Sequence, residues 1–101
     1  MTAIVVFSTF QTPDQAAEVA RKLVGEGLAA CVNLVPQIRS IYRWKGAVCD
    51  ETETLAVIKS TRERQDALIA RLVALHPYEL AEAIAVAADG GSAAYLAWLQ
   101  T

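Results

Sequence analysis

The stretch "SIYRWKGAV", Ser40 to Val48, decides the fold of this chain. Lys45-Gly46 predicts a tight turn between two segments rich in β-forming residues, and therefore a β-hairpin. Its arms fall in 28–44 and 48–60, so that each runs for roughly 13 to 16 residues, against about 5–6 in a usual strand. At ~3.3 Å per residue such an arm reaches ~45–50 Å. We therefore expect the hairpin to extend beyond its own domain.

The tip of this hairpin carries large apolar side chains, Tyr42 and Trp44. Leaving them in water is costly, so we expect the tip to pack on a second copy of the chain. Pro36 then marks a bulge where the arm leaves the home sheet. The alternative is a shorter, bent hairpin with a solvated tip.

A strand and a helix are predicted before the hairpin. The apolar, β-branched run "AIVVF", Ala3 to Phe7, is typical of a strand buried on both faces. Thr12 and Pro13 predict a capped helix start, and the glycines at 25 and 27 predict its end.

A similar set of elements follows the hairpin. Thr61 is expected to cap a second helix, which Pro77 ends. Its buried side is predicted to hold Leu68, Ile69, Leu72, Val73 and Leu75. A fourth strand is expected over 80–88, and a short last helix carries Tyr95, Leu96, Trp98 and Leu99.

The order β-α-β-β-α-β-α contains no linker or low-complexity segment. It predicts one α+β domain over residues 1–101, a ferredoxin-like βαββαβ sandwich with a long central hairpin and a short C-terminal helix. Both helices would cover one face of the sheet. The other face would need a cover that the chain does not obviously supply.

Composition restricts the class of partner. The chain is 54% hydrophobic, and surplus apolar surface on a small domain usually goes into subunit contacts. The net charge is -2 without a basic block, so nucleic acid is not an expected partner. No apolar run approaches the ~18 residues that span a bilayer, and the N-terminus lacks a secretory pattern, so we expect no membrane partner and a cytoplasmic location.

The two cysteines, Cys31 and Cys49, match no zinc motif. Cys31 is interpreted as a small buried hydrophobe. An unbulged hairpin sets Cys49 opposite Tyr42 and Cys31 opposite Ser60, so we expect no disulfide between them. The acidic run Asp50, Glu51 and Glu53 is interpreted as a solvated strand face, with weak attraction of divalent cations as the alternative.

Four stretches together resemble one family, the CutA divalent-cation tolerance proteins. They are "LAACVNLVP" (28–36), "SIYRWKG" (40–46), "HPYELAEAIAV" (76–86) and "YLAWL" (95–99), in the family's order and spacing. The resemblance implies a ferredoxin-like subunit, a cytosolic homotrimer with sheet pairing between subunits, and a role in tolerance of divalent cations, copper above all. The architecture is also similar to that of the PII signalling proteins, which bind small effectors between subunits.

The chain departs from that family at positions that bear on metal. Copper ligands of some members correspond here to Ser8, Leu75 and His76, of which only His76 retains a ligating side chain. Ala81 stands where the family often has proline. The expected ligand is Cu²⁺ or another divalent cation, bound weakly, and no cofactor is required.

His76 and Glu79 are the predicted metal ligands. The alternative for His76 is structural: the ring ends a helix, where a partly cationic imidazole favours the helix dipole. His76 with Glu82 is also the one conceivable acid–base pair. No nucleophile or cofactor signature accompanies this pair, so we predict a protein that is not an enzyme.

Glu82 shares strand parity with apolar neighbours, so we expect it to face the core or an interface and to need a basic partner. Lys59, Arg62 and Arg64 are the expected bases. A predicted effector cleft between subunits holds Lys59, Arg62, Tyr78 and Glu82, and the predicted subunit interface holds Tyr42, Trp44, Tyr95 and Trp98. The alternative is a bulge at Ala81 that turns Glu82 into water.

Overall fold

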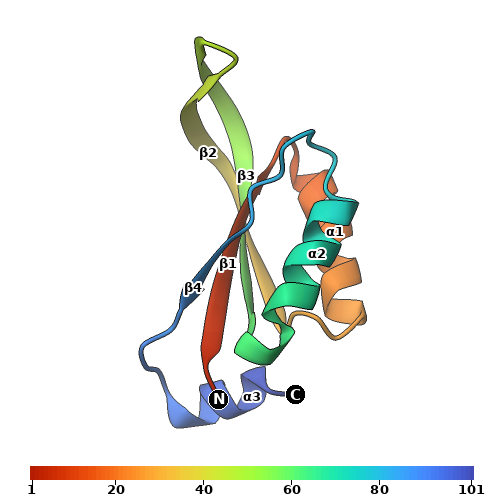
Figure 1. The fold of residues 1–101 in the computed structure, drawn as a ribbon, viewed down its shortest axis with the longest axis vertical. Coiled ribbons are helices and arrows are strands. Elements are labelled where there is room, and N and C mark those ends of the chain that lie inside the picture. Colours follow the sequence, from red (N-terminus) through yellow and green to blue (C-terminus); the bar gives the residue numbers. More distant parts are fainter.

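The computed structural model describes all 101 residues as a four-stranded antiparallel sheet with two helices packed on one face (Figure 1). The strands lie in the order β2-β3-β1-β4, as a ferredoxin-like βαββαβ fold requires. In chain order the elements are β1 (Ala3–Phe10), α1 (Pro13–Gly25), β2 (Cys31–Trp44), β3 (Ala47–Thr61), a 3₁₀ turn (Arg62–Arg64), α2 (Gln65–Leu75), β4 (Ile84–Ala87) and α3 (Ala93–Leu99). The predicted fold class is confirmed.

The core lies between the central strands and the two long helices. Alternate residues of β1, among them Ile4, Val6 and Phe10, are buried, because successive side chains of a strand point to opposite faces. They meet the apolar stripes of α1 and α2, which include Leu23 and Leu68. The opposite face of β4 keeps Ile84 58% exposed and Val86 50% exposed. The sheet therefore has one covered and one largely open face, as predicted.

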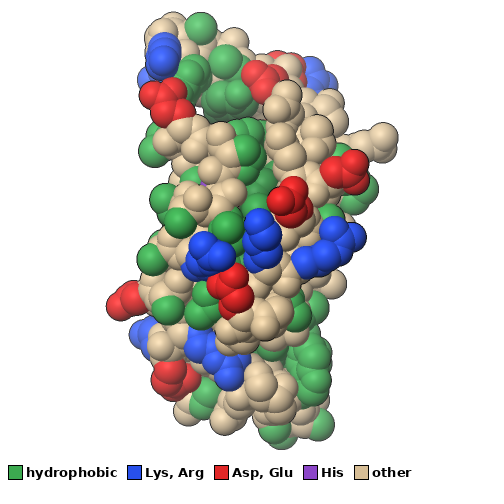
Figure 2. Space-filling model, turned by 90° about the vertical axis from the view of Figure 1, so that its right-hand side faces the viewer, with side chains coloured by type: hydrophobic (Ala, Val, Ile, Leu, Met, Phe, Trp, Pro, Cys, Tyr) green, Lys and Arg blue, Asp and Glu red, His purple; other side chains and the backbone are tan.

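The surface of the helical layer carries charged side chains of both signs. Figure 2 shows acidic and basic side chains interspersed over this side of the molecule. One of the pairs there joins Arg71 to Glu26 by two hydrogen bonds of 2.9 Å. Val73 of α2, predicted to be buried, is 50% exposed, so the apolar stripe of α2 is narrower than expected.

The central hairpin extends beyond the sheet, as its length predicted. Within β3, only Thr54–Thr61 pair with β1, so the first half of β3 continues with β2 as a two-stranded arm (Figure 1). The longest dimension of the chain is 44 Å, and its radius of gyration is 14.0 Å. At the tip, Lys45 has φ 50° and Gly46 φ 81°, which confirms the predicted two-residue turn.

A bulge interrupts β2 at the position that Pro36 indicated. The pairing of β2 with β3 shifts register between Val35 and Ile38, and Gln37 takes a left-handed φ of 61°. Beyond the bulge, Cys49 lies opposite Tyr42, as predicted. Before it, Cys31 lies opposite Lys59 rather than Ser60, because one extra residue in β2 shifts the register by one.

The ends of several elements differ from the prediction. Thr12 caps α1 as expected, and its Oγ1 accepts from the Gln15 amide at 3.2 Å. The Thr61 side chain caps nothing, because a 3₁₀ turn intervenes before α2. β4 begins at Ile84 rather than at residue 80, because only Ile84–Ala87 pair with β1.

Candidate functional site

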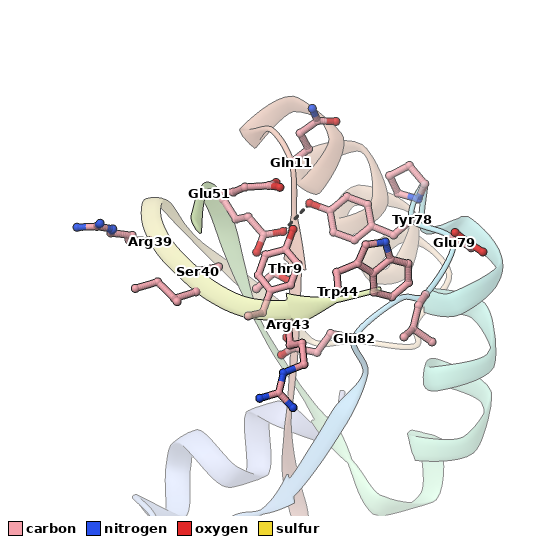
Figure 3. Close-up of a pocket in the computed structure, with 15 residues that line it drawn as sticks. Thr9, Gln11, Arg39, Ser40, Arg43, Trp44, Glu51, Tyr78, Glu79 and Glu82 are labelled. Atoms are coloured by element: carbon pink, nitrogen blue, oxygen red, sulfur yellow. Dashed lines mark hydrogen bonds between the residues drawn. The ribbon is translucent and has the colours of Figure 1, made fainter. Parts of the chain in front are cut away.

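A cleft of about 910 Å³ lies between the distal hairpin and the segment that joins α2 to β4 (Figure 3). The hairpin contributes aromatic and charged side chains, chiefly Tyr42, Trp44, Glu51 and Glu53. The joining segment contributes residues 77–80 and Glu82. The fold creates this cleft because the hairpin continues past the point where β1 ends and β4 begins.

His76 fixes the joining segment to the sheet. Its Nε2 lies 2.9 Å from the carbonyl oxygen of Thr9, and its Nδ1 accepts from the Tyr78 amide at 3.1 Å. Nε2 therefore carries the proton and donates it to Thr9. The ring stacks on Phe10 with a centroid distance of 4.2 Å. Burial lowers the pKa of His76, although the hydrogen bond to Thr9 partly opposes this shift.

This geometry bears directly on the predicted ligand role of His76. Neither ring nitrogen has a lone pair free, because Nδ1 accepts a backbone amide and Nε2 is protonated. Metal binding through His76 thus requires release of the Tyr78 amide. The alternative interpretation, in which His76 ends a helix, is correct in position, because His76 follows α2 directly. The ring of His76 is neutral, however, rather than partly cationic.

Glu53 and Tyr78 form the polar floor of the cleft. The Tyr78 hydroxyl donates to Glu53 Oε2 at 2.5 Å, which joins the two walls (Figure 3). Glu53 is only 7% exposed, so the interpretation of the whole acidic run as a solvated face was wrong at this residue. Burial, and then the bond to Glu53, raise the pKa of the Tyr78 phenol.

Glu82 lies in the same cleft, half-buried, and its charged neighbour is acidic. Burial raises the pKa of Glu82, and the negative charge of Glu53 raises it further. None of the four ion pairs of the chain involves Glu53 or Glu82. The expected base beside Glu82 is therefore absent within the chain.

The predicted bases lie at the other end of the sheet. Lys59 pairs with Val5 of β1, and its Nζ lies 3.5 Å from the Tyr95 hydroxyl. Arg62 follows β3 directly, and its amide donates to the Thr2 carbonyl. Within one chain, Lys59 and Arg62 thus do not line the cleft that holds Tyr78 and Glu82.

Arg64 has a different role from that expected. Its guanidinium donates to the carbonyl oxygens of the last three residues, at 3.3, 2.9 and 3.3 Å. It therefore holds the end of α3 beside the start of α2. Two of the predicted interface residues, Tyr95 and Trp98, lie on α3 with ring centroids 5.5 Å apart and are half-exposed.

The rest of the cleft wall is charged and aromatic. Hydrogen bonding to Glu51 raises the pKa of the Tyr42 phenol to about 12. Arg39 points away from the cleft (Figure 3) and binds Asp50 through two hydrogen bonds, of 2.8 and 2.6 Å. Lys45 Nζ lies 3.9 Å from Glu79 Oε2 and 5.5 Å from the centroid of the Trp44 ring.

A three-ligand copper site does not fit the side chains of this chain. No group of three or more His, Cys, Asp or Glu side chains is placed to hold a metal ion. Ser8 is fully buried, and its Oγ has no hydrogen-bond partner. Cys31 and Cys49 are both free thiols, and Cys31 is partly exposed rather than buried.

The sequence predicted Tyr78 and Glu82 as cleft residues but not Glu53, the buried carboxylate that accepts from the Tyr78 hydroxyl. Strand parity gave no signal of burial, because it places Glu53 with the half-buried Leu55 and Val57 on the face of β3 away from the core, and its contact with Tyr78 joins distant segments. No helix of the chain is both long and apolar enough to cross a membrane.

Comparison with known proteins connects this architecture to one family. Residues 4–101 match the family model described as CutA1 divalent ion tolerance protein. The Thermus thermophilus divalent-cation tolerance protein CutA is 43% identical over 96 residues, which cover 95% of this chain and 93% of that protein. Human Protein CutA is 44% identical over 94 residues, or 93% of this chain. The chain spans about half, 52%, of the length of the human and mouse relatives.

Solved structures agree with the sequence relatives. CutA from Xylella fastidiosa superposes with a TM-score of 0.93 at 42% identity, over 96% of this chain and 93% of that chain. The divalent cation tolerance protein from Thermus thermophilus gives the same TM-score and identity, over 97% and 95% of the two chains.

Proposed function

The chain belongs to the CutA1 divalent ion tolerance protein family, and from that premise we propose that it acts in divalent-cation tolerance as a non-catalytic homotrimer that binds the cation weakly. The observation that carries the binding proposal is the pair of carboxylates Glu53 and Glu82, which face one cleft without a basic partner. A divalent cation at this pair would relieve the repulsion between them.

We place the first contacts of the ion on carboxylate oxygen. Glu53, Glu82 and the predicted ligand Glu79 all line the cleft. Oxygen ligands without a closed set of donors give weak and poorly selective binding, which suits exchange of a cation rather than its storage. His76 joins as a ligand if Nδ1 gives up the Tyr78 amide. Otherwise it positions Tyr78 and, through it, Glu53.

Calorimetric titration with Cu²⁺ and with Mg²⁺ tests this proposal. Glu82→Gln should weaken binding of both ions, whereas the exposed Glu63→Gln removes the same charge far from the cleft and should not. His76→Gln should weaken Cu²⁺ alone if the imidazole joins the ligands. Tight binding of Cu²⁺ that survives both Glu82→Gln and His76→Gln would contradict the assignment.

The homotrimer proposal rests on surface that one chain leaves uncovered. Ile84 and Val86 expose apolar side chains on the open sheet face, and Tyr42, Trp44, Tyr95 and Trp98 are the proposed contact residues. The projecting hairpin also presents unpaired strand edges, which favour pairing with another copy. Sedimentation equilibrium should give three chains, and a stable monomer at micromolar concentration would refute the assembly.

A non-catalytic role fits the state of the one conceivable acid–base pair. His76 has both ring nitrogens committed to backbone groups, so it is not free to take a proton from a substrate. We propose a cytosolic location, in which Cys31 and Cys49 stay reduced. Names of relatives include the terms chloroplastic and periplasmic, so fractionation of cells is the measurement for this chain.

A second candidate function is the binding of a small effector, as in PII-like modules. The observation that favours it is the size of the cleft, about 910 Å³, which suits a small organic molecule. Titration with a panel of metabolites, in parallel with the metal titrations, separates the two functions.

A further inference from the structure

The chain's own ammonium group shows how the rim of the cleft accommodates a cation. The Lys45 Nζ lies 5.5 Å from the Trp44 ring centroid and 3.9 Å from Glu79 Oε2. An aromatic face beside a carboxylate is the arrangement that recognises ammonium ions. Within one chain both contacts are exposed to solvent, so they hold Lys45 only weakly, and another ammonium can replace it.

Deeper in the cleft, two carboxylates lack any cation. Glu53 is 7% exposed, and its one hydrogen-bond partner, the Tyr78 hydroxyl, is neutral. Glu82 is half-buried beside it. A buried carboxylate is normally paired with a positive charge, because removal from water is costly. The inner part of the cleft is thus electrostatically complementary to a second positive charge.

The basic residues of the cleft do not supply that charge. Arg39 is bound to Asp50 and points away (Figure 3). Arg43 lines the cleft but is exposed, and it makes no ion pair with either glutamate. Arg43 alone stands against Glu51, Glu53 and Glu82, so the interior keeps a net negative charge.

We propose that this cleft binds an aliphatic diamine, with one ammonium at Trp44 and Glu79 in place of Lys45 and the other at Glu53 and Glu82. Tight binding of a bare metal ion would need three converging donors, which the cleft lacks, whereas its aromatic walls suit an organic cation. The inference rests on the second candidate function, and it makes the effector a cation because the charged neighbour of Glu82 is an acid and not a base.

Calorimetric titration of the full chain with putrescine tests the proposal, in phosphate buffer free of amines. Butylamine and butanediol are matched probes, because they keep the carbon chain with one ammonium or none. Putrescine is expected to bind at least ~10-fold more tightly than butylamine, since it adds a second partly desolvated ion pair. Butanediol is expected to give no binding.

Substitutions then locate the two ammonium groups. Glu53→Gln should weaken putrescine by ~10-fold or more, whereas Glu63→Gln, an equal change of charge at an exposed site, should not. Lys45→Asn, which suits the left-handed turn position, should tighten binding because it frees the outer position. The control for its charge is Lys22→Ala on α1, which should have little effect.

If Glu53→Gln does not fold, Glu82→Gln and Lys45→Asn provide the same test, with circular dichroism to establish folding. Equal losses in Glu82→Gln and Glu63→Gln would show non-specific attraction and overturn the proposal. Failure of putrescine to bind at millimolar concentration also overturns it. Binding of other metabolites in that case would leave the effector function intact, and binding of Cu²⁺ alone would leave the metal function.

Discussion

The imidazole of His76 donates to the carbonyl oxygen of Thr9, a residue 67 positions earlier in the chain, and the two atoms lie 2.9 Å apart. This bond fixes the neutral tautomer of the ring and ties the segment after α2 to the end of β1. It also positions Tyr78, whose amide donates to the same ring. The geometry of the cleft thus depends on a histidine that does not line it.

The first prediction concerns the response of the protein to acid. Burial lowers the pKa of His76 in the folded state, so the unfolded chain binds its proton first as the pH falls. The stability that the neutral His76 ring contributes is complete above pH 6.5, and it is lost as the pH falls from 6.5 through the pKa of the folded state. His76→Gln keeps a donor and an acceptor but does not titrate. Urea unfolding at a series of pH values should show a smaller loss below pH 6.5 in the variant than in the native chain.

The second prediction is that Glu82 affects the pH dependence of stability in the opposite direction to His76. Its pKa is raised in the folded state, so the ionised form destabilises the fold, and the penalty applies above that raised pKa. Acidification towards the unfolded value of 4.5 removes the penalty. Glu82→Gln is therefore expected to raise the free energy of unfolding at neutral pH and to have little effect near pH 4.5. A loss of stability at neutral pH would show instead that a base pairs with Glu82 in the assembly.

The buried hydroxyl of Ser8 supports a third prediction. Its Oγ is inaccessible to solvent and has no hydrogen-bond partner, which carries a desolvation penalty of ~1–3 kcal/mol. Ser8→Ala should therefore raise the free energy of unfolding, by ~1 kcal/mol after the loss of packing contacts. Ser60 is equally buried, but its Oγ donates to the Leu28 carbonyl at 2.7 Å. Ser60→Ala is the matched control and should destabilise the protein in the same urea measurement.

A fourth prediction concerns the bulge in β2. Gln37 has φ 61°, a conformation that costs a residue other than glycine ~1–2 kcal/mol. Gln37→Gly should raise the thermal midpoint, because relief of this strain exceeds the added freedom of the unfolded chain. Ser40→Gly, in the regular part of the same strand, should lower the thermal midpoint, because it reduces the free energy of unfolding by ~0.5–1 kcal/mol. Similar effects of the two glycines would mean that the bulge is not strained.

Local signals in the sequence predicted the fold well. Lys45-Gly46 specified the turn, Pro36 indicated the bulge and Thr12 specified the cap of α1, because each depends on the chemistry of adjacent residues. Errors arose where distant segments decide the outcome. β4 begins only at Ile84, because its pairing with β1 determines where the strand starts, and apolar patterning does not report that pairing.

The site was less predictable for the same reason. Tyr78 and Glu82 were identified locally, but the Tyr78 partner, Glu53, lies 25 positions earlier and on another strand. Lys59 and Arg62 were predicted to line a cleft between subunits because they lie at the end of β3, and within one chain they do not reach the cleft of Tyr78 and Glu82. Antiparallel pairing places the end of β3 beside the start of β1, whereas the cleft lies beside the end of β1.

The central position of β1 in the sheet also affects how the chain is made. β1 leaves the ribosome before both of its partners, and its pairing cannot be completed until residue 61 of β3 and residue 87 of β4 have emerged. β2 and β3, joined by a two-residue turn, can pair as soon as both are synthesised. During this interval the nascent chain carries a hairpin and an unpaired, β-branched β1 that is prone to aggregation. Chaperones that cover residues 3–10 are therefore expected to influence the yield of the folded protein more than any factor that acts on the hairpin.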